Sequence, residues 1–278
     1  AAWRVNARLG EDLGANLISL NKHLEPLGFI SLLDEGNPPI LSVTHRPIDQ
    51  INIALWQQIS IWIMMFSFAT LLGGLWIDVF ESKTIVFSIS VVLESIINYS
   101  GPLFLILALA HYARLRVAAY FDVEIGNLIP IIFPVISPMW PFGIGGVFGQ
   151  KRIDAAPIPN RYALGIIEFT TPLILFFSGM VLTVAGLSLT PDQPPDYIVD
   201  PLSFQLNPLT DWIASSFISA DLNIRLQWLH PLGLAGIGLS VVGWILLLPI
   251  PGLPGDRILQ AIIGPEQVLS SEKQTGIF

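Results

Sequence analysis

Long apolar stretches alternate with short polar segments along this chain of 278 residues, and they predict four membrane-spanning helices. A helix that crosses the hydrocarbon core needs about 20 consecutive apolar residues. One such stretch would also fit a buried core helix, but four of them in one chain favour spans. The expected spans cover residues 53–77, 84–115, 162–187 and 231–250, and Gly101-Pro102 interrupts the second.

The pattern before the first span predicts a small α+β cap formed by residues 1–50. Residues 11–24 carry apolar positions at helical spacing. Two short apolar runs, GFISLL and ILSV, follow and are separated by the turn-forming cluster DEGNPP. We therefore expect a helix and a β-hairpin outside the lipid. Residues 51–262 then form the membrane core, and residues 263–278 form a C-terminal tail.

Residues 127–149 fit neither a spanning helix nor an ordinary loop. The stretch is almost entirely apolar, but prolines at positions 130, 134, 138 and 141 exclude a continuous helix. Non-helical backbone at membrane depth is tolerated only where protein buries it or where it lines a cavity. We expect a re-entrant hairpin that ends in a strand.

Residues 209–229 follow a loop rich in proline and aspartate, and they predict one amphipathic helix. Trp212 and Trp228 belong to this segment. Tryptophan on an amphipathic helix is suited to the boundary between lipid and water. We expect the helix to lie in that boundary.

Composition agrees with a mainly α membrane protein. The chain is 53% hydrophobic and 12% charged, its mean hydropathy is +0.66, and soluble domains carry about 25% charged residues. The net charge of −8, with 13 scattered Lys and Arg, argues against nucleic acid as a partner. The absence of cysteine excludes disulfides, cysteine-ligated zinc and iron–sulfur clusters.

Basic residues predict that both termini face the cytoplasm. With four spans, the N-terminus, residues 116–161 and the C-terminal tail share one side of the membrane. Of the 13 Lys and Arg residues, all but Lys83 and Arg225 lie on that side or at the adjoining helix end. Lys and Arg accumulate on the cytoplasmic side of membrane proteins, so this side is expected to be cytoplasmic.

Four pieces of the sequence, taken in order, resemble the site-2 protease family of intramembrane zinc metalloproteases. They are HYARLRVAAY at 111–120, GGVFGQKRIDAAPIPNRYAL at 145–164, TTPLILFFSG at 170–179 and HPLGLAGIGLSVVGWILLLPIPGLPGDRIL at 230–259. The resemblance covers residues 100–262. In that family, two histidines of an HExxH helix and a distant aspartate hold zinc, and the glutamate activates water.

Most residues at the corresponding catalytic positions are replaced. His111 keeps the first histidine, but Tyr112 stands at the glutamate, Leu115 at the second histidine and Pro254 at the aspartate. Leucine and proline carry no atom that binds a metal. The resemblance therefore implies an inactive member of the family that holds no cofactor.

Two alternatives remain open at this stage. His111, Asp256 and Glu168 could rebuild a zinc site, which would make the chain an active metalloprotease with a remodelled centre. Glu94 and Glu168 lie inside predicted spans, where ionisable residues are costly and often functional, so an ion or proton pathway is the second alternative. As structural roles, Glu94 could bond with the polar residues 98–100, and Glu168 with Arg161 or Tyr162.

The strand at 145–149 supplies the binding prediction. In the family, extended substrate is thought to add to the edge strand near this motif, and the resemblance implies that this strand could bind a partner segment in the same way. An exposed edge offers unpaired N–H and C=O groups, and glycine permits close approach. The strand could instead pair only within its own hairpin. The residues concerned are Gly145, Gly146, Val147, Phe148 and Gly149.

Together these patterns predict a non-catalytic subunit of a membrane complex with a structural or regulatory role. Its partners would be the lipid bilayer and other membrane-protein subunits.

Overall fold

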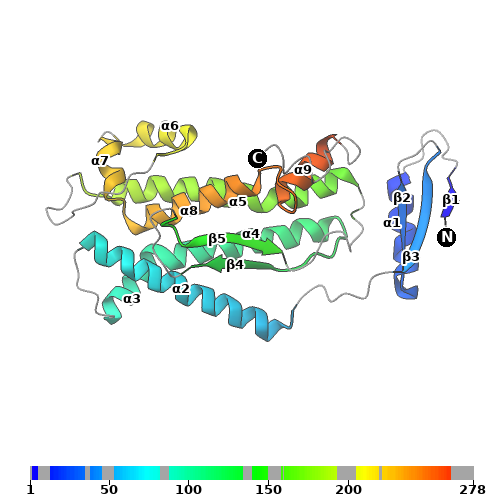
Figure 1. Cartoon of the computed structure of the whole chain (residues 1–278), viewed down its shortest axis with the longest axis horizontal. Helices are drawn as coiled ribbons and strands as arrows, with labels where there is room; N and C mark the ends of the chain where they lie inside the picture. The colour runs from blue at the N-terminus through cyan, green and yellow to red at the C-terminus, as the bar shows by residue number, and fades with distance from the viewer. Residues whose placement is uncertain are drawn as a thin grey trace.

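The computed structural model is mainly helical. Figure 1 shows a group of helices around a β-hairpin, with a small α+β unit at one end. The predicted tail, apart from Ile263, lies outside the described residues, as do parts of the predicted loops. The structure describes residues 2–5, 13–34, 38–45, 53–81, 88–133, 140–149, 158, 160–192, 205–218 and 221–263.

The α+β unit contains a helix and a hairpin where the sequence predicts them. Its elements are β1 (Ala2–Arg4), α1 (Leu13–Leu24), η1 (Glu25–Leu27), β2 (Phe29–Asp34) and β3 (Ile40–His45). The sheet is antiparallel with the order β1-β3-β2. Asn21 fastens α1 to the sheet, because its Oδ1 accepts from the Ser31 N–H at 2.7 Å and its Nδ2 donates to the Ser31 carbonyl at 3.1 Å. Strand β1 was not predicted, since three residues are too few to show an alternating pattern.

Three helices are long and apolar enough to cross a membrane, so the chain is a mainly α membrane protein by length and composition. They correspond to the first three predicted spans. The first is α2 (Leu55–Glu81), whose apolar part is Leu55–Ile77. The second is the continuous helix Ile89–Tyr120, and the third is α5 (Arg161–Leu189).

The second helix is not interrupted at Gly101-Pro102, so this part of the prediction was wrong. It consists of α3 (Ile89–Ser95), the π-helical turn η2 (Ile96–Ser100) and α4 (Gly101–Tyr120). The wider turn lets the Gly101 N–H donate to the Ile96 carbonyl. Proline has no N–H, and its ring would collide with a carbonyl of the preceding turn in a regular helix. The π turn accommodates the ring, and the helix continues.

The fourth predicted span is a shorter helix than expected. It is α8 (Pro231–Leu246), which has 16 residues and a length of about 24 Å, whereas the hydrocarbon core is about 30 Å thick. Prolines at positions 249 and 251 end the helix early, because neither can donate a backbone hydrogen bond. A turn then leads to α9 (Pro254–Ile263).

Together α8 and α9 return along the whole of α5. Gly233 of α8 lies against Gly186 near the end of α5, and Ala261 of α9 lies 3.3 Å from the position of a Cβ on Gly165 near its start. Backbones approach closely between these points. A Cβ on Gly236 would come within 2.6 Å of the Gly179 carbonyl, so only glycine fits there.

The segment predicted to be re-entrant forms a β-hairpin whose described strands are β4 (Leu128–Ile132) and β5 (Ile144–Gly149). They pair antiparallel, with an irregularity at Ile131/Ile132. Trp62 and Trp76 of α2 hold opposite ends of the hairpin, since their Nε1 atoms donate to the Leu128 and Pro141 carbonyls at 3.2 Å. These tryptophans are separated by about 21 Å along α2. The hairpin is therefore level with the apolar part of this helix.

The single helix predicted at 209–229 was wrong, because the chain forms two helices there. They are α6 (Pro208–Phe217) and α7 (Leu222–Gln227). Asp221 starts the second helix by accepting from the Asn223 N–H at 2.9 Å, a capping signal that the apolar pattern hid. Trp212 is 68% exposed, whereas Trp228 is 7% exposed and packs inside the protein.

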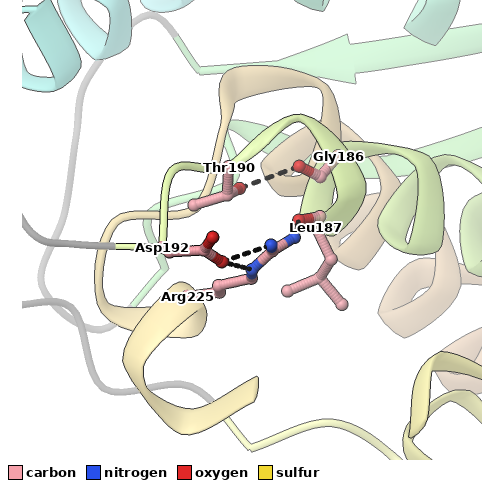
Figure 2. Close-up of polar contacts among 5 residues, drawn as sticks. All are labelled: Gly186, Leu187, Thr190, Asp192 and Arg225. Atoms are coloured by element: carbon pink, nitrogen blue, oxygen red, sulfur yellow. Dashed lines mark hydrogen bonds and ion pairs between the residues drawn. The ribbon is translucent and has the colours of Figure 1, made fainter. Parts of the chain in front are cut away.

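Arg225 of α7 closes the C-terminal end of α5 (Figure 2). Its Nη1 donates to the Leu187 carbonyl at 2.7 Å, and its Nε and Nη2 donate to the Asp192 carboxylate. Thr190 donates to the Gly186 carbonyl at 2.8 Å and accepts from the His230 N–H at 3.0 Å. The last carbonyls of a helix lack partners within it, so these contacts complete α5 and position the start of α8.

Replacing Arg225 with methionine is expected to lower the free energy of unfolding by about 1–3 kcal/mol, because the Leu187 carbonyl loses its charged donor. Asp192→Asn is the control. Its side chain is 71% exposed, and exposed ion pairs contribute about 0–1 kcal/mol. Thermal unfolding in detergent checks both variants, and equal losses would contradict the assigned role of the Leu187 contact.

Replacing Gly236 with alanine is expected to destabilise the bundle by about 1–3 kcal/mol, because the new methyl group collides with α5. Gly74→Ala in α2 is the matched control. Its Cβ would meet only Val91, at 3.6 Å, so it should gain up to about 1 kcal/mol from helix propensity. Unfolding temperatures that shift in opposite directions would confirm the close packing of α5 and α8.

Candidate functional site

The outer edge of β4 is covered by side chains from the neighbouring helices. The Leu128 N–H donates to His111 Nδ1 at 3.2 Å, and its carbonyl accepts from Trp62. The Ile132 N–H donates to Met65 Sδ at 3.3 Å. Between them, Pro130 has no N–H to satisfy. Strand β4 is therefore closed to a further strand.

The outer edge of β5 is the free edge of the hairpin. In an antiparallel pair, successive residues direct their backbone groups alternately toward and away from the partner strand. Leu128 and Pro130 of β4 direct theirs away from β5, so the residues opposite them, Gly149 and Val147, direct theirs away from β4. Within the described residues, no hydrogen bond reaches the outward groups of Val147 and Gly149.

The five predicted binding residues therefore differ in what they present. Gly146 and Phe148 pair with β4 through their backbones, and the Phe148 side chain is 48% exposed. Gly145 is exposed, and the ring of Phe133 beside it leaves no space for a Cβ. Val147 and Gly149 direct their N–H and C=O groups away from β4. Val147 as a whole is buried, whereas Phe148 and Gly149 at the end of β5 are exposed.

A buried pair of opposite charges lies beside the end of this edge. Arg114 of α4 donates from Nη1 to the Gly126 carbonyl at 3.0 Å, and a Cβ on Gly149 would lie 3.6 Å from its guanidinium nitrogens. Its Nη2 is 4.0 Å from Glu168 Oε1 of α5, and the two side chains are 7% and 4% exposed. Arg257 of α9 interacts electrostatically with both groups.

Glu168 therefore faces Arg114 rather than residues 161 and 162 at the start of α5, with which the sequence suggested a bond. The position of Arg114 could not be read from the sequence, since its distance from Glu168 depends on how α4 packs against α5. The sequence does carry one signal for this pair. Arg114 and Glu168 both lie inside apolar helices, where an arginine and a glutamate are expected to be partners.

His111 stabilises the hairpin in this structure by accepting the Leu128 N–H. Because Nδ1 accepts a backbone N–H, the neutral ring carries its hydrogen on Nε2. Neither nitrogen then has a lone pair available to a metal. The ring also lies 5.9 Å from that of Trp62, centroid to centroid.

The other positions compared with the metalloprotease motif are dispersed. Tyr112 is exposed and accepts from Arg116 Nε at 2.7 Å, while Leu115 packs against a small apolar cluster. Pro254 begins α9, where Asp256 accepts from Gln260 at 3.1 Å. In the part of the chain that the structure describes, no three His, Asp or Glu side chains form a group that could hold a metal ion.

Polar residues near Glu94 connect two spans. Ser95 donates to the Thr70 carbonyl at 2.6 Å, and the hydroxyls of Ser100 and Thr70 lie 2.9 Å apart. Tyr99 donates to the Phe142 carbonyl at 2.5 Å and so holds the hairpin near its turn. This patch fastens α2, η2 and the hairpin to one another.

Comparison with known proteins adds no relative to this picture. No protein-family model, curated protein or solved structure matches the chain. Within the described residues, the outward edge of β5 and the buried Arg114–Glu168 pair beside it are the features on which a function can be argued.

Replacing His111 with leucine is expected to lower the free energy of unfolding by about 1–3 kcal/mol, because the Leu128 N–H loses its acceptor inside the protein. Tyr112→Phe is the control, since it removes one exposed hydrogen bond and should have little effect. Thermal unfolding measures both. An unchanged unfolding temperature for the His111 variant would show that this residue does not support the hairpin.

Proposed function

We propose that this chain is a non-catalytic integral membrane protein that acts as a structural or regulatory subunit. In this proposal it has the core of a site-2 protease without the protease chemistry. It binds an extended segment of a partner membrane protein, which adds as a third strand to the hairpin along β5.

The observation that carries the proposal is the unpaired outer edge at Val147 and Gly149. Strand addition satisfies such an edge with main-chain hydrogen bonds. The edge belongs to a hairpin that is level with the apolar part of α2. Backbone groups without partners cost several kcal/mol in hydrocarbon, so a bound strand would gain more there than at a surface in water.

The absence of catalysis is supported by the chemistry at the former motif. His111 uses its lone pair on the backbone of Leu128. Tyr112, Leu115 and Pro254 replace the base and two ligands of the family pattern. A Tyr hydroxyl is a poor base near neutral pH, since its ordinary pKa is about 10.

The proposed topology has four crossings and a re-entrant hairpin, with both termini in the cytoplasm. In it α8 and α9 together make the fourth crossing, which agrees with their course along α5. The start of α2 and the end of α4 then lie on the cytoplasmic side with the basic residues. Exposed Trp212 on α6 contacts the lipid boundary on the opposite side.

Strand addition can be tested with a photo-crosslinking amino acid in place of Phe148, whose exposed side chain adjoins the edge. In native membranes we expect a crosslink to one extended apolar segment, identified by mass spectrometry. Val147→Pro should abolish it, because proline removes an outward N–H that the hairpin itself does not use. Pro130, opposite Val147, shows that the ladder tolerates proline at this position.

Val147→Ala is the matched control, since it also shortens the side chain but keeps the outward N–H. A crosslink that survives in the proline variant, or that disappears equally in both variants, would overturn binding by strand addition. The same probe in place of exposed Phe217 on α6 reports contacts that do not involve the edge.

Metal content separates this proposal from an active protease. Purified protein is expected to contain much less than one zinc per chain and to cleave no membrane substrate. Stoichiometric zinc together with proteolysis that chelators abolish would refute the proposal. If such activity survived His111→Ala and Asp256→Ala, those residues would not be the ligands.

A further inference from the structure

Two buried polar atoms on one face of α5 have no hydrogen-bond partner within the described structure. They are Glu168 Oε1 and Thr171 Oγ1. Residues three apart on a helix lie on the same face, about 5–6 Å from each other. Glu168 lies against Arg114 of α4, and Thr171 lies about one turn further along the same face of α5.

Arg114 of α4 faces Glu168. Its only hydrogen bond in the described structure runs from Nη1 to the Gly126 carbonyl. Its Nη2 is 4.0 Å from Glu168 Oε1, which is too far for a hydrogen bond. The pair thus approaches without bonding directly, although both side chains are more than nine-tenths buried.

The spacing of these atoms favours a third group that bonds to both. One oxygen atom placed about 2.9 Å from each would see them at an angle of about 90°, which a hydroxyl can accommodate. The same position suits a carboxamide, whose oxygen would accept from Arg114 while its nitrogen donates to Glu168.

Charge narrows the choice of group. A carboxylate would be repelled by Glu168, and an ammonium by Arg114 and by Arg257 nearby. A purely apolar group would leave Arg114 Nη2 and Glu168 Oε1 without hydrogen bonds inside the protein, which is costly for buried charged groups. A neutral group that both donates and accepts matches Arg114 and Glu168, and it can also bond to a hydroxyl such as that of Thr171.

We propose that Arg114, Glu168 and Thr171 form a binding site for one small neutral group that both donates and accepts hydrogen bonds. Two sources have this chemistry. One is a water molecule, and the other is a Ser, Thr, Asn or Gln side chain of the segment bound along β5. The second source rests on the proposed function, and it is possible because Gly149, at the end of that edge, lies against the Arg114 guanidinium.

Thr171→Val tests the site, because valine has nearly the same shape and lacks the hydroxyl. If a group is bound, the variant loses a hydrogen bond, and its unfolding temperature should fall by about 2–4 °C. If the hydroxyl has no partner, its removal should instead raise the temperature, since an unsatisfied buried polar group is destabilising. Thr170→Val is the control, because Thr170 bonds only to the Ile166 carbonyl of its own helix.

The measurement is made on the chain purified alone in lipid nanodiscs and on the chain with its crosslinked partner. A fall in both samples identifies water, and a fall only in the complex identifies a partner side chain. A rise or no change in both samples overturns the site. The sample without partner remains informative if no partner is found, so a failure of strand binding is distinguished from a failure of this site.

Discussion

The structure depends on one constraint: backbone hydrogen-bonding groups buried among apolar helices need partners. Helices satisfy theirs internally, whereas a hairpin has two outer edges that do not. Here α2 and α4 supply the missing partners for β4 through side chains. The residues are Trp62, Met65 and His111. Trp76 of α2 and Tyr99 of η2 bond in addition to the carbonyls of residues 141 and 142, just before β5. The arrangement of the first two spans thus agrees with the edge they cover, and it leaves the outer edge of β5 without a hydrogen-bond partner within the described residues.

The same constraint explains the ends and irregularities of the helices. The π turn before Pro102 gives the Gly101 N–H an acceptor and lets a proline-containing helix continue. At the C-terminal end of α5, Thr190 and Arg225 donate hydrogen bonds to the carbonyls of Gly186 and Leu187. Each of these contacts is local, but each also connects two elements: the π turn connects α3 with α4, and Arg225 connects α7 with α5. Backbone satisfaction and tertiary packing are therefore achieved by the same residues.

The sequence predicted those features that depend on composition over many residues. The first three spans and the proline-spaced hairpin follow from apolar length and from the positions of proline. Features decided by single residues were missed. Asp221 starts a new helix inside an apolar pattern, and two prolines shorten α8. The Arg114–Glu168 pair was missed for another reason, because a contact between two helices depends on their rotation, which periodicity alone does not give.

His111 illustrates how an imidazole side chain can stabilise the edge of a strand. A metal ligand needs a free lone pair, and a neutral imidazole has one to offer. Here that lone pair accepts the Leu128 N–H and covers the edge of β4. The histidine therefore supports the hairpin without any contribution from Tyr112 or Leu115. Because β5 pairs with β4, the hydrogen bond from His111 to β4 also helps to fix the position of β5.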